Sequence, residues 1–290
     1  MISSNNNGIK IKLKININNT MQKSGLNRNT LDKFYTKPAL VDSCFIKINE
    51  LLSIDKNNDM IIEPSAGGGS FIEAIKGICE NYQFYDIAPE HSDIINKDYL
   101  TIDLSKVSRK IHVIGNPPFG RQSSSAIKFI KHSCKYCESI SFILPKSFKK
   151  DSLKKKFPLN FHCIHESDVP VNSFEINQND HNVPCIFQIW IKRGFNREIP
   201  KILKPNGYKF VKKNENHDIS FRRVGVNAGN ISLDTDDKSE QSHYFIKFDK
   251  PLNQNSIQKI KSISFLKSSD TVGPKSISKQ ELIKEFSEIF

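Results

Sequence analysis

Short apolar runs alternate with helical patterns from residue 60 to residue 144, and this alternation restricts the fold more than any other feature of the chain. Buried strands are predicted at 60–62, 83–85, 111–114 and 139–144. Apolar residues recur at helical spacing at 29–52, 69–77 and 124–137. Such alternation with short loops predicts a doubly wound, mostly parallel α/β sheet covered on both faces. Two later strands, 161–164 and 185–191, have no helical pattern between them, which predicts a late antiparallel strand.

The basic residues divide the chain into three parts. The net charge is +12 over 290 residues; residues 1–33 carry six Lys or Arg and one acid, 34–193 carry 20 and 18, and 194–290 carry 17 and 12. We therefore expect a flexible basic arm at 1–28, an α/β domain at 29–193 and a small C-terminal segment at 194–290. A polyanion such as DNA or RNA is the natural partner of basic ends. The alternative is an AT-rich genome, which raises Lys, Asn and Ile everywhere.

The apolar and cysteine content restricts the cellular compartment in which the protein is expected. No run of 18 apolar residues exists, so no transmembrane helix is expected, and the polar N-terminus lacks the core of a signal peptide. These features predict a soluble intracellular protein of the cytoplasm or nucleus. The six cysteines are expected to be free thiols. A zinc site built from Cys134, Cys137, His162, Cys163 and His165 is the alternative, and no metal is predicted.

The segment 61–71 reads as a strand, a glycine turn and the start of a helix. Glu63 ends the strand, and small residues at 65–69 let the backbone approach a ligand closely. There is no Gly-Lys-Ser/Thr, which excludes a triphosphate-binding P-loop, whereas an NAD site would read similarly. Asp86 ends the next strand, where an acid accepts hydrogen bonds from ribose hydroxyls. Asp98 follows a third short segment and is a candidate acceptor for an adenine amino group; solvated surface charges are the alternative.

Asn116-Pro117-Pro118-Phe119 follows the predicted buried strand 111–115. The prolines fix φ and have no N–H, so the carbonyls of Asn116 and Pro117 are expected to be fixed acceptors. With the Asn116 side chain, they suit an exocyclic amino group, which carries two N–H donors. Phe119 supplies a flat face on which a nucleobase can stack. The alternative is a proline-stiffened turn after a strand.

This tetrapeptide resembles the amine-binding motif of the adenine-N6 amino-methyltransferases, which carry Asn/Asp-Pro-Pro-Tyr/Phe. The segment 63–71 is similar to that branch's Glu-Pro-Ser-Ala-Gly-x-Gly-x-Phe form, and 34–38 resembles the upstream element that caps the methionine end of the cofactor. The segment 143–148 resembles the strand and loop after the catalytic motif. The resemblance covers about residues 30–193, in the motif order of the gamma arrangement. It implies a Rossmann-like class I methyltransferase fold.

The resemblance also implies transfer of a methyl group from S-adenosylmethionine to adenine N6 in nucleic acid, with DNA favoured over RNA. It assigns the amine site to Asn116, Pro117, Pro118 and Phe119. It assigns the cofactor site to Tyr35, Thr36, Pro38, Glu63, Pro64, Ala66, Gly67, Gly69, Asp86, Ile87, Asp98, Tyr99 and Asn116. The C-terminal segment is the candidate for target recognition.

Basic residues near these motifs are candidates for phosphate contacts. They are Arg121, Lys146, Lys149, Lys150, Arg222 and Arg223, with Lys154, Lys155 and Lys156 in the same lysine cluster. A solvated helix face is the alternative for the lysines.

Other amine substrates stay open. Protein-glutamine methyltransferases use a similar Asn-Pro-Pro-Tyr, and some ribosomal RNA guanine-N2 enzymes use Asn-Pro-Pro-Phe-His. Here Gly120 follows the tetrapeptide, and the 34–38 element favours adenine. A non-catalytic nucleic-acid-binding subunit is a further alternative, and the oligomeric state is open.

Overall fold

The computed structural model describes residues 34–176 and 179–289. The predicted basic arm at 1–28 lies outside the described residues, as do residues 29–33 of the first helical pattern. Helix α1 occupies Pro38–Leu51, with its proline in the first turn, where the missing N–H has no partner to lose.

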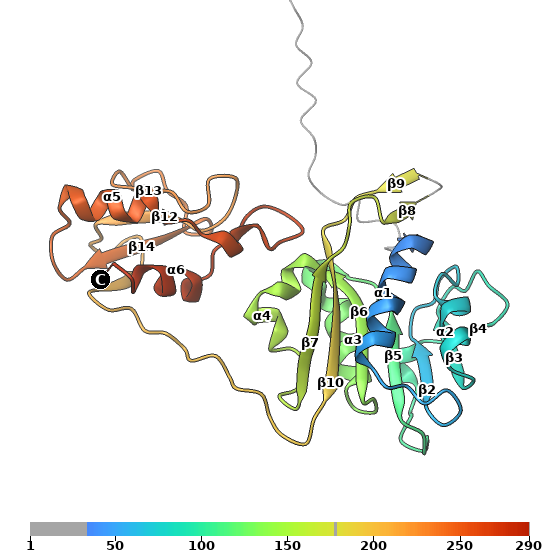
Figure 1. The fold of residues 1–290 in the computed structure, drawn as a ribbon. Helices are drawn as coiled ribbons and strands as arrows, with labels where there is room; N and C mark the ends of the chain where they lie inside the picture. The colour runs from blue at the N-terminus through green and yellow to red at the C-terminus, as the bar shows by residue number, and fades with distance from the viewer. Residues whose placement is uncertain (1–33, 177–178, 290) are drawn as a thin grey trace, which may run out of the picture. The chain divides into compact units, whose positions relative to one another are not determined.

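A seven-stranded sheet forms the centre of the structure, in the order β4-β3-β2-β5-β6-β10-β7 (Figure 1). Its strands are β2 (Met60–Glu63), β3 (Tyr82–Asp86), β4 (Ile94–Asn96), β5 (Ile111–Gly115), β6 (Ser139–Pro145), β7 (Phe161–Asp168) and β10 (Cys185–Lys192). The first five are parallel, and β10 runs antiparallel between β6 and β7. The expected fold class, a Rossmann-like doubly wound sheet with a late antiparallel strand, is confirmed.

Two apolar layers cover the two faces of this sheet. Neighbouring strand residues point to opposite faces, so Ile61 joins one core cluster and Ile62 the other. Helices α1 and α2 (Ile72–Ile78) pack in the first cluster, and α3 (Ser124–Ser133) packs in the second. The pattern at 124–137 predicted a longer α3. After Ser133 the backbone forms tighter turns, such as Lys135 N–H to the His132 carbonyl, and these end the helix.

Short elements complete this part of the chain. Strand β1 (Tyr35–Thr36) pairs antiparallel with β8 (Phe174–Ile176), which pairs with β9 (Asn179–His181). The remaining short helices are η1 (Tyr99–Thr101), η2 (Arg121–Ser123), η3 (Lys146–Lys149) and α4 (Asp151–Lys154).

The C-terminal segment contains a second sheet, with strand order β11-β14-β12-β13. Its elements are β11 (Tyr208–Val211), β12 (Ile219–Arg222), β13 (Ile231–Ser232), β14 (His243–Phe248), α5 (Gln254–Ser262), η4 (Leu266–Ser269) and α6 (Lys279–Phe286). Ile260 of α5 and Leu282, Ile283 and Phe286 of α6 bury one face of this sheet in a third apolar cluster. The sequence predicted only short strands, loops and a last helix at 278–290; α5 was missed because most of its residues are polar.

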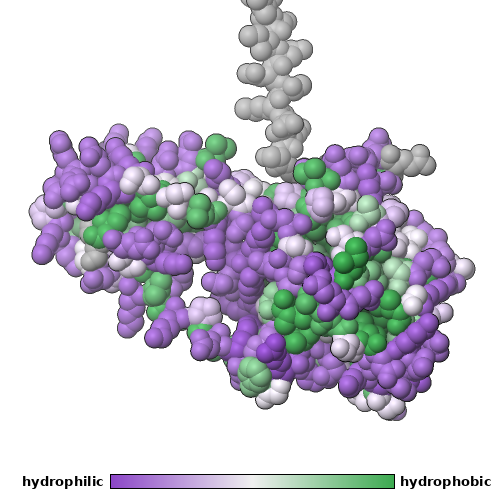
Figure 2. Space-filling view, viewed as in Figure 1, coloured by the Kyte–Doolittle hydropathy of each residue, from purple (hydrophilic) through white to green (hydrophobic). Residues whose placement is uncertain are grey.

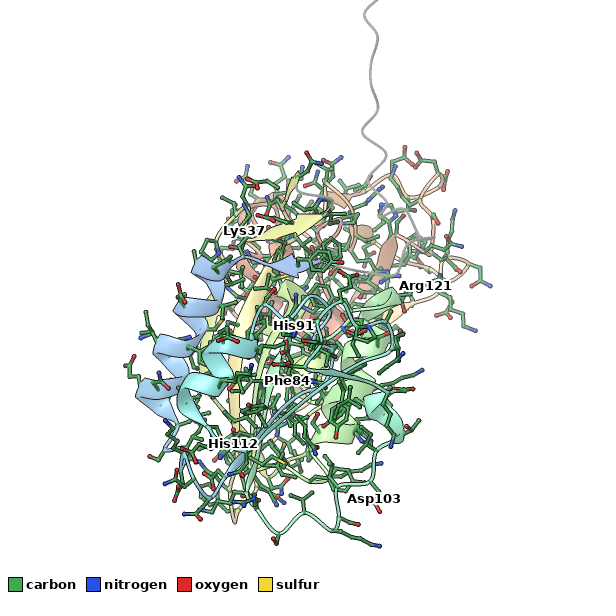
Figure 3. The ribbon with its side chains drawn as sticks, turned by 90° about the vertical axis from the view of Figure 1, so that its right-hand side faces the viewer. Lys37, Phe84, His91, Asp103, His112 and Arg121 are labelled. Carbon is green, nitrogen blue, oxygen red and sulfur yellow. The ribbon has the colours of Figure 1, made fainter. Side chains whose placement is uncertain are left out.

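A buried polar network joins the amino ends of three neighbouring strands. His112 of β5 contacts the Ser139 hydroxyl through Nδ1 at 2.7 Å and Asp59 Oδ2 through Nε2 at 3.2 Å. Asp59, His112 and Ser139 are only 5%, 6% and 1% exposed, so no substrate reaches them. Figure 3 places His112 at the opposite end of the sheet from Lys37 and Arg121. Burial lowers the pKa of His112, which keeps its imidazole neutral and the network structural.

Replacing Ser139 with Ala tests this network. Ser139→Ala leaves His112 Nδ1 buried without its partner, which we expect to cost about 1–3 kcal/mol in the free energy of unfolding. Ser141→Ala on the same strand is the matched control, because the buried Ser141 Oγ has no hydrogen-bond partner among the described residues. It should be neutral or stabilising in urea unfolding. Equal losses in the two variants would show that the network adds no stability.

Candidate functional site

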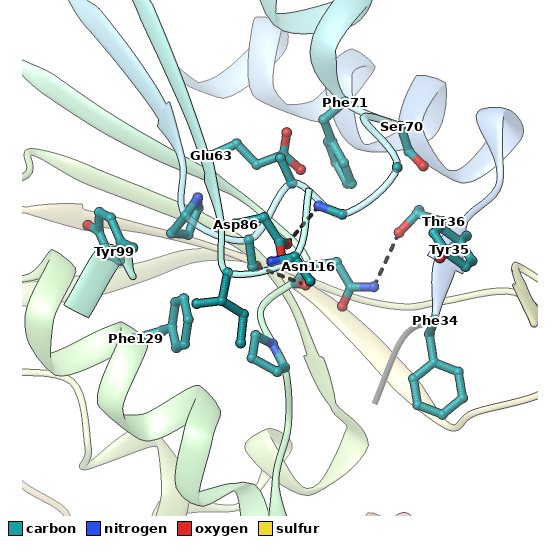
Figure 4. A pocket seen from close by; sticks show the side chains of 18 of the residues that line it. Phe34, Tyr35, Thr36, Glu63, Ser70, Phe71, Asp86, Tyr99, Asn116 and Phe129 are labelled. Atoms are coloured by element: carbon teal, nitrogen blue, oxygen red, sulfur yellow. Dashed lines mark hydrogen bonds between the residues drawn. The ribbon is translucent and has the colours of Figure 1, made fainter. Parts of the chain in front are cut away.

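A cavity of about 280 Å³ lies at the carboxyl ends of β2, β3 and β5 (Figure 4). The chain leaves β2 towards β3 on one side, while β5 lies on the other, so the cavity occupies the point where the strand order reverses. Open α/β sheets bind their ligands at this switch point. The lining residues are Phe34, Tyr35, Thr36, Glu63, Pro64, Ser65, Ala66, Gly67, Gly68, Ser70, Phe71, Asp86, Ile87, Ala88, Lys97, Asp98, Tyr99, Leu100, Asn116, Pro118 and Phe129.

The glycine turn after β2 presents bare backbone to this cavity. Gly67 has φ +51°, in the left-handed region that favours glycine, and a Cβ there would meet open space. A Cβ on Gly68 would lie 3.1 Å from the Tyr35 ring. The absence of side chains at this turn therefore lets the Tyr35 ring approach the backbone and leaves room for a ligand beside Gly67.

Asp86 holds the glycine turn in place. One carboxylate oxygen accepts from the Gly67 N–H and the other from the Ala88 N–H, both at 2.8 Å. A carboxylate has about four acceptor positions, so Asp86 keeps capacity for hydroxyl donors of a ligand. The fixed backbone bonds also set the direction in which those positions face.

Glu63 differs from Asp86 because it is a buried carboxyl group with a raised pKa. It is 2% exposed, and its Oε2 has no hydrogen-bond partner among the described residues. Burial, and secondarily the charge of Asp86, raise the pKa of Glu63 to about 8. A buried carboxyl with an unpaired oxygen favours a ligand that brings hydrogen-bond donors or positive charge.

Asp98 lies on the exposed rim of the cavity, just after β4. Its Oδ1 accepts from the Leu100 N–H at 2.9 Å and so caps η1. Ile87, which is 61% exposed, and the buried ring of Tyr99 contribute apolar surface to the lining. The rim thus combines a carboxylate with an apolar face, which suits a heteroaromatic ring.

Asn116 comes directly after β5 and is tethered on the cavity side. Its Nδ2 donates to Thr36 Oγ1 at 3.2 Å, and Ser65 Oγ donates to its backbone carbonyl at 3.3 Å. The tether leaves Asn116 Oδ1 as an acceptor that none of the described residues occupies. Thr36 is itself fixed through the pairing of β1 with Phe174 of β8. Two remote segments therefore orient the Asn116 amide.

The loop after the tetrapeptide has unusual backbone angles. Gly120, Gln122 and Ser123 have φ of 67°, 53° and 62°, so two non-glycine residues adopt the left-handed region. The Phe119 carbonyl accepts from the Ser125 and Ala126 N–H groups, which fixes the loop to the start of α3. Such strained positions cluster at ligand sites and switch regions.

Most predicted cofactor residues are brought together at the cavity. Tyr35, Thr36, Glu63, Pro64, Ala66, Gly67, Asp86, Ile87, Asp98, Tyr99 and Asn116 line it, as does Pro118 of the tetrapeptide. Four residues predicted for the cofactor or amine site do not line the cavity: Pro38, Gly69, Pro117 and Phe119. Pro38 starts α1, Gly69 lies against Ile72 and His91, Pro117 is buried, and Phe119 packs partly against the core. The predicted stacking face is thus not exposed to the cavity in this structure.

Several lining residues were missed. Ser65 and Gly68 lie in the stretch 65–69 that was expected to approach a ligand but were not assigned individually, and Ser70 and Phe71 belong to the same segment. Phe34, Ala88, Lys97 and Leu100 are neighbours of predicted residues. Phe129 reaches the cavity from α3 through tertiary packing, and no local sequence signal marks it.

The predicted phosphate-binding lysines have acidic partners. Lys149 and Lys146 lie 2.8 Å and 3.7 Å from Asp168. Lys150 donates to the Ser276 carbonyl at 2.6 Å and lies 3.3 Å from Glu281, and Lys154 lies 2.8 Å from Glu166. These pairs reduce the charge offered to a polyanion. Arg121, in the loop after the tetrapeptide, is exposed.

The zinc alternative gains no support. No group of three or more His, Cys, Asp or Glu side chains in residues 34–176 and 179–289 is placed to hold a metal ion. Cys134 and Cys163 are free thiols, and burial raises the pKa of each.

Within residues 34–176 and 179–289, no helix has the length and apolar content that crossing a membrane requires. The surface seen in Figure 2 is largely hydrophilic, with an apolar patch on the part that contains the central sheet.

Comparisons with known proteins give only distant likenesses. No protein-family model matches the chain, and no curated protein matches it in sequence. A candidate RNA methyltransferase from Pyrococcus horikoshii aligns with TM-score 0.44 and 14% identity, over 56% of this chain and 87% of that one. The 23S rRNA methyltransferase ErmE aligns with TM-score 0.42 and 13% identity, over 57% and 71%. An rRNA methylase from Streptococcus thermophilus aligns with TM-score 0.37 and 13% identity, over 54% and 96%. At these values the likeness says nothing of what this chain binds.

The raised pKa of Glu63 predicts a pH-dependent stability of the ligand-free protein. The folded pKa lies above the unfolded value, so stability falls as pH rises from about 4.5 to about 8. Glu63 should contribute a slope of about −1.4 kcal/mol per pH unit in this window. Glu63→Gln removes that contribution, while Glu73→Gln, on an exposed side chain of α2, keeps the wild-type slope. Denaturant unfolding at pH 5, 6, 7 and 8 measures it, and parallel wild-type and Glu63→Gln curves would contradict the assignment.

Proposed function

We infer that this protein transfers a methyl group from S-adenosylmethionine to the N6 amino group of adenine in nucleic acid. The observation that carries the proposal is the tethered Asn116 amide. Its Nδ2 is engaged by Thr36, and its Oδ1 is free to accept from an amino group at the edge of the cavity. An acceptor fixed at the end of β5, beside a glycine-turn pocket, matches the needs of amine methylation. The order of the motifs favours DNA over RNA as the substrate.

The cavity residues fit the parts of S-adenosylmethionine. Asp86 has remaining acceptor capacity for ribose hydroxyls, and the rim at Ile87, Tyr99 and Asp98 suits an adenine ring with its amino group. The unpaired, buried Glu63 carboxyl suits positive charge on the ligand, and the open backbone at Gly67 leaves space beside it. When bound, the cofactor supplies a methyl group on a positively charged sulfur, which is already activated for transfer.

The chain then has to orient the acceptor nitrogen. An exocyclic amine is a poor nucleophile, because its lone pair is delocalised into the ring. Asn116 Oδ1 accepts from one N–H and draws the nitrogen towards a tetrahedral geometry. Among the described residues, the Asn116 carbonyl accepts only from Ser65 Oγ, at 3.3 Å, and keeps a second lone pair. Positioning and fixed dipoles are the main contributions of the protein to such a reaction.

A base in duplex DNA must leave the stack to reach this site, at a cost of a few kcal/mol. Stacking on an aromatic face offsets roughly 1–3 kcal/mol of such a cost. We assign this role to Phe119, whose ring is partly buried and whose loop contains the strained Gln122 and Ser123. Relaxation of this loop would expose the ring to the base.

Methyl transfer from labelled S-adenosylmethionine to duplex DNA, single-stranded DNA and RNA tests the proposal, with products resolved as nucleosides by mass. We expect N6-methyladenine. Asn116→Ala should lower kcat by about 10²–10³-fold, as for loss of one preorganised polar group, with cofactor affinity little changed. Asn49→Ala, on the exposed side of α1, is the matched control and should keep full activity.

The outcomes separate the alternatives. Product in the RNA pool alone would move the substrate from DNA to RNA. Cofactor binding without transfer to any pool would favour a protein substrate, such as glutamine, or a partner-dependent subunit. A chain that binds no S-adenosylmethionine would overturn the proposal.

A further inference from the structure

A second cavity, of about 380 Å³, lies in the C-terminal segment, away from the residues of the proposed methyl-transfer site. Residues of β12, β13 and β14 line it, together with the connections 223–230 and 233–242. Ile231 is the one apolar residue of its lining; the others carry hydroxyl, amide, imidazole or charged groups. A cavity of this composition lacks the flat apolar face on which a base would stack.

Ser220 contributes to this cavity a buried hydroxyl that lacks a hydrogen-bond partner in the part of the chain that the structure describes. Ser220 is 1% exposed, and its Oγ has no hydrogen-bond partner among the described residues. Its neighbours Ile219 and Phe221 point into the third apolar cluster, so Ser220 faces the other side of the sheet, where the cavity lies. A buried hydroxyl without a partner is costly, and a ligand oxygen that accepts from it would remove that cost.

Arg222 gives the cavity one uncompensated positive charge. It lies on the same side of β12 as Ser220, opposite His243 of β14. Arg222 Nε donates to the Val224 carbonyl at 2.9 Å, and no carboxylate of the described residues pairs with the guanidinium. The other two charged residues, Lys238 and Asp237, pair with each other. The net charge of the cavity is therefore that of Arg222.

A phosphodiester group matches this arrangement. It carries one negative charge, its oxygens only accept hydrogen bonds, and it needs no apolar contact. The guanidinium has N–H donors left after the bond to Val224, and the Ser220 hydroxyl supplies a buried donor.

We propose that this cavity binds one backbone phosphate of the nucleic-acid substrate, held by Arg222 and Ser220. The proposal rests on the proposed function, because it takes the substrate to be a nucleic acid. It adds a fixed contact at a second place on the chain, which positions the strand without reading its sequence.

Inorganic phosphate is the first probe, with the full-length protein at constant ionic strength set by chloride. Phosphate should raise the Tm of the wild type and of Asn116→Ala, but not of Arg222→Gln or Ser220→Ala. Ser220→Ala should have the higher Tm without phosphate, because it removes an unpaired buried hydroxyl. A phosphate shift that survives in Arg222→Gln overturns the proposal.

Fluorescein-labelled single-stranded and duplex DNA are the second probes, with affinity measured against salt concentration. Arg222→Gln should lower the number of released counterions by about one. The charge-matched control is Arg193→Gln, an exposed arginine over the Phe195 ring, which should keep the wild-type slope. An equal decrease of the slope in both variants would show that Arg222 acts only through general charge and would overturn the fixed contact.

The two probes also distinguish sources of phosphate. Loss of the phosphate shift in Arg222→Gln with an unchanged salt slope would assign the cavity to a free phosphate-bearing molecule and overturn the backbone contact. Neither probe reads methyl transfer, so a failure of the proposed activity would leave both results intact.

Discussion

The chain leaves β2 in one direction and returns to the sheet as β5 on the other side of it, and the backbone cannot fill the gap between the two connections. The polar groups of the candidate site in the central sheet all lie at this gap. The glycine turn after β2, the acid after β3 and the asparagine after β5 all reach it because parallel strands end at the same edge of a sheet. The buried network at the other edge, with His112 between Asp59 and Ser139, joins the amino ends of β2, β5 and β6.

Two carboxyl groups of the cavity, those of Asp86 and Glu63, have opposite environments. Asp86 accepts two backbone N–H bonds, whereas Glu63 is buried with one oxygen unpaired. Asp86 therefore shapes the turn with part of its acceptor capacity, whereas Glu63 has an oxygen that no described residue pairs and that a ligand would pair. In the C-terminal sheet, Ser220 repeats this pattern with a hydroxyl. In both places a buried polar group without a hydrogen-bond partner among the described residues lines a cavity, whereas the equally unpaired Ser141 lines neither of the two cavities.

The sequence predicted the parts of the fold and site that depend on local order. Glu63 and Asp86 end their strands, Gly67 lies in the turn after β2 and Asn116 directly follows β5, so the strand pattern was enough to place them at one edge. Phe129 joins the cavity only through packing of α3, and the lysines of 146–154 meet acids such as Asp168 that lie on another strand. The Phe119 ring was expected at the cavity but packs partly against the core, because its orientation depends on the loop that follows it. The C-terminal sheet was predicted only as unspecified short strands, because strands such as the two-residue β13 are too short to give a clear pattern.

The tether between Thr36 and Asn116 has a consequence for the order of folding. Thr36 belongs to β1, which is held by Phe174 of β8, a residue far along the chain. During synthesis from the N-terminus, strands β2 to β6 can pair before β8 exists, but the Asn116 amide has its anchor only afterwards. The five parallel strands can thus be paired before the site is set, whereas β10, β7 and the pairing of β1 with β8 all wait for later parts of the chain. Long-range pairing of this kind adds loop-closure cost, so we expect the site to be ordered after the parallel strands.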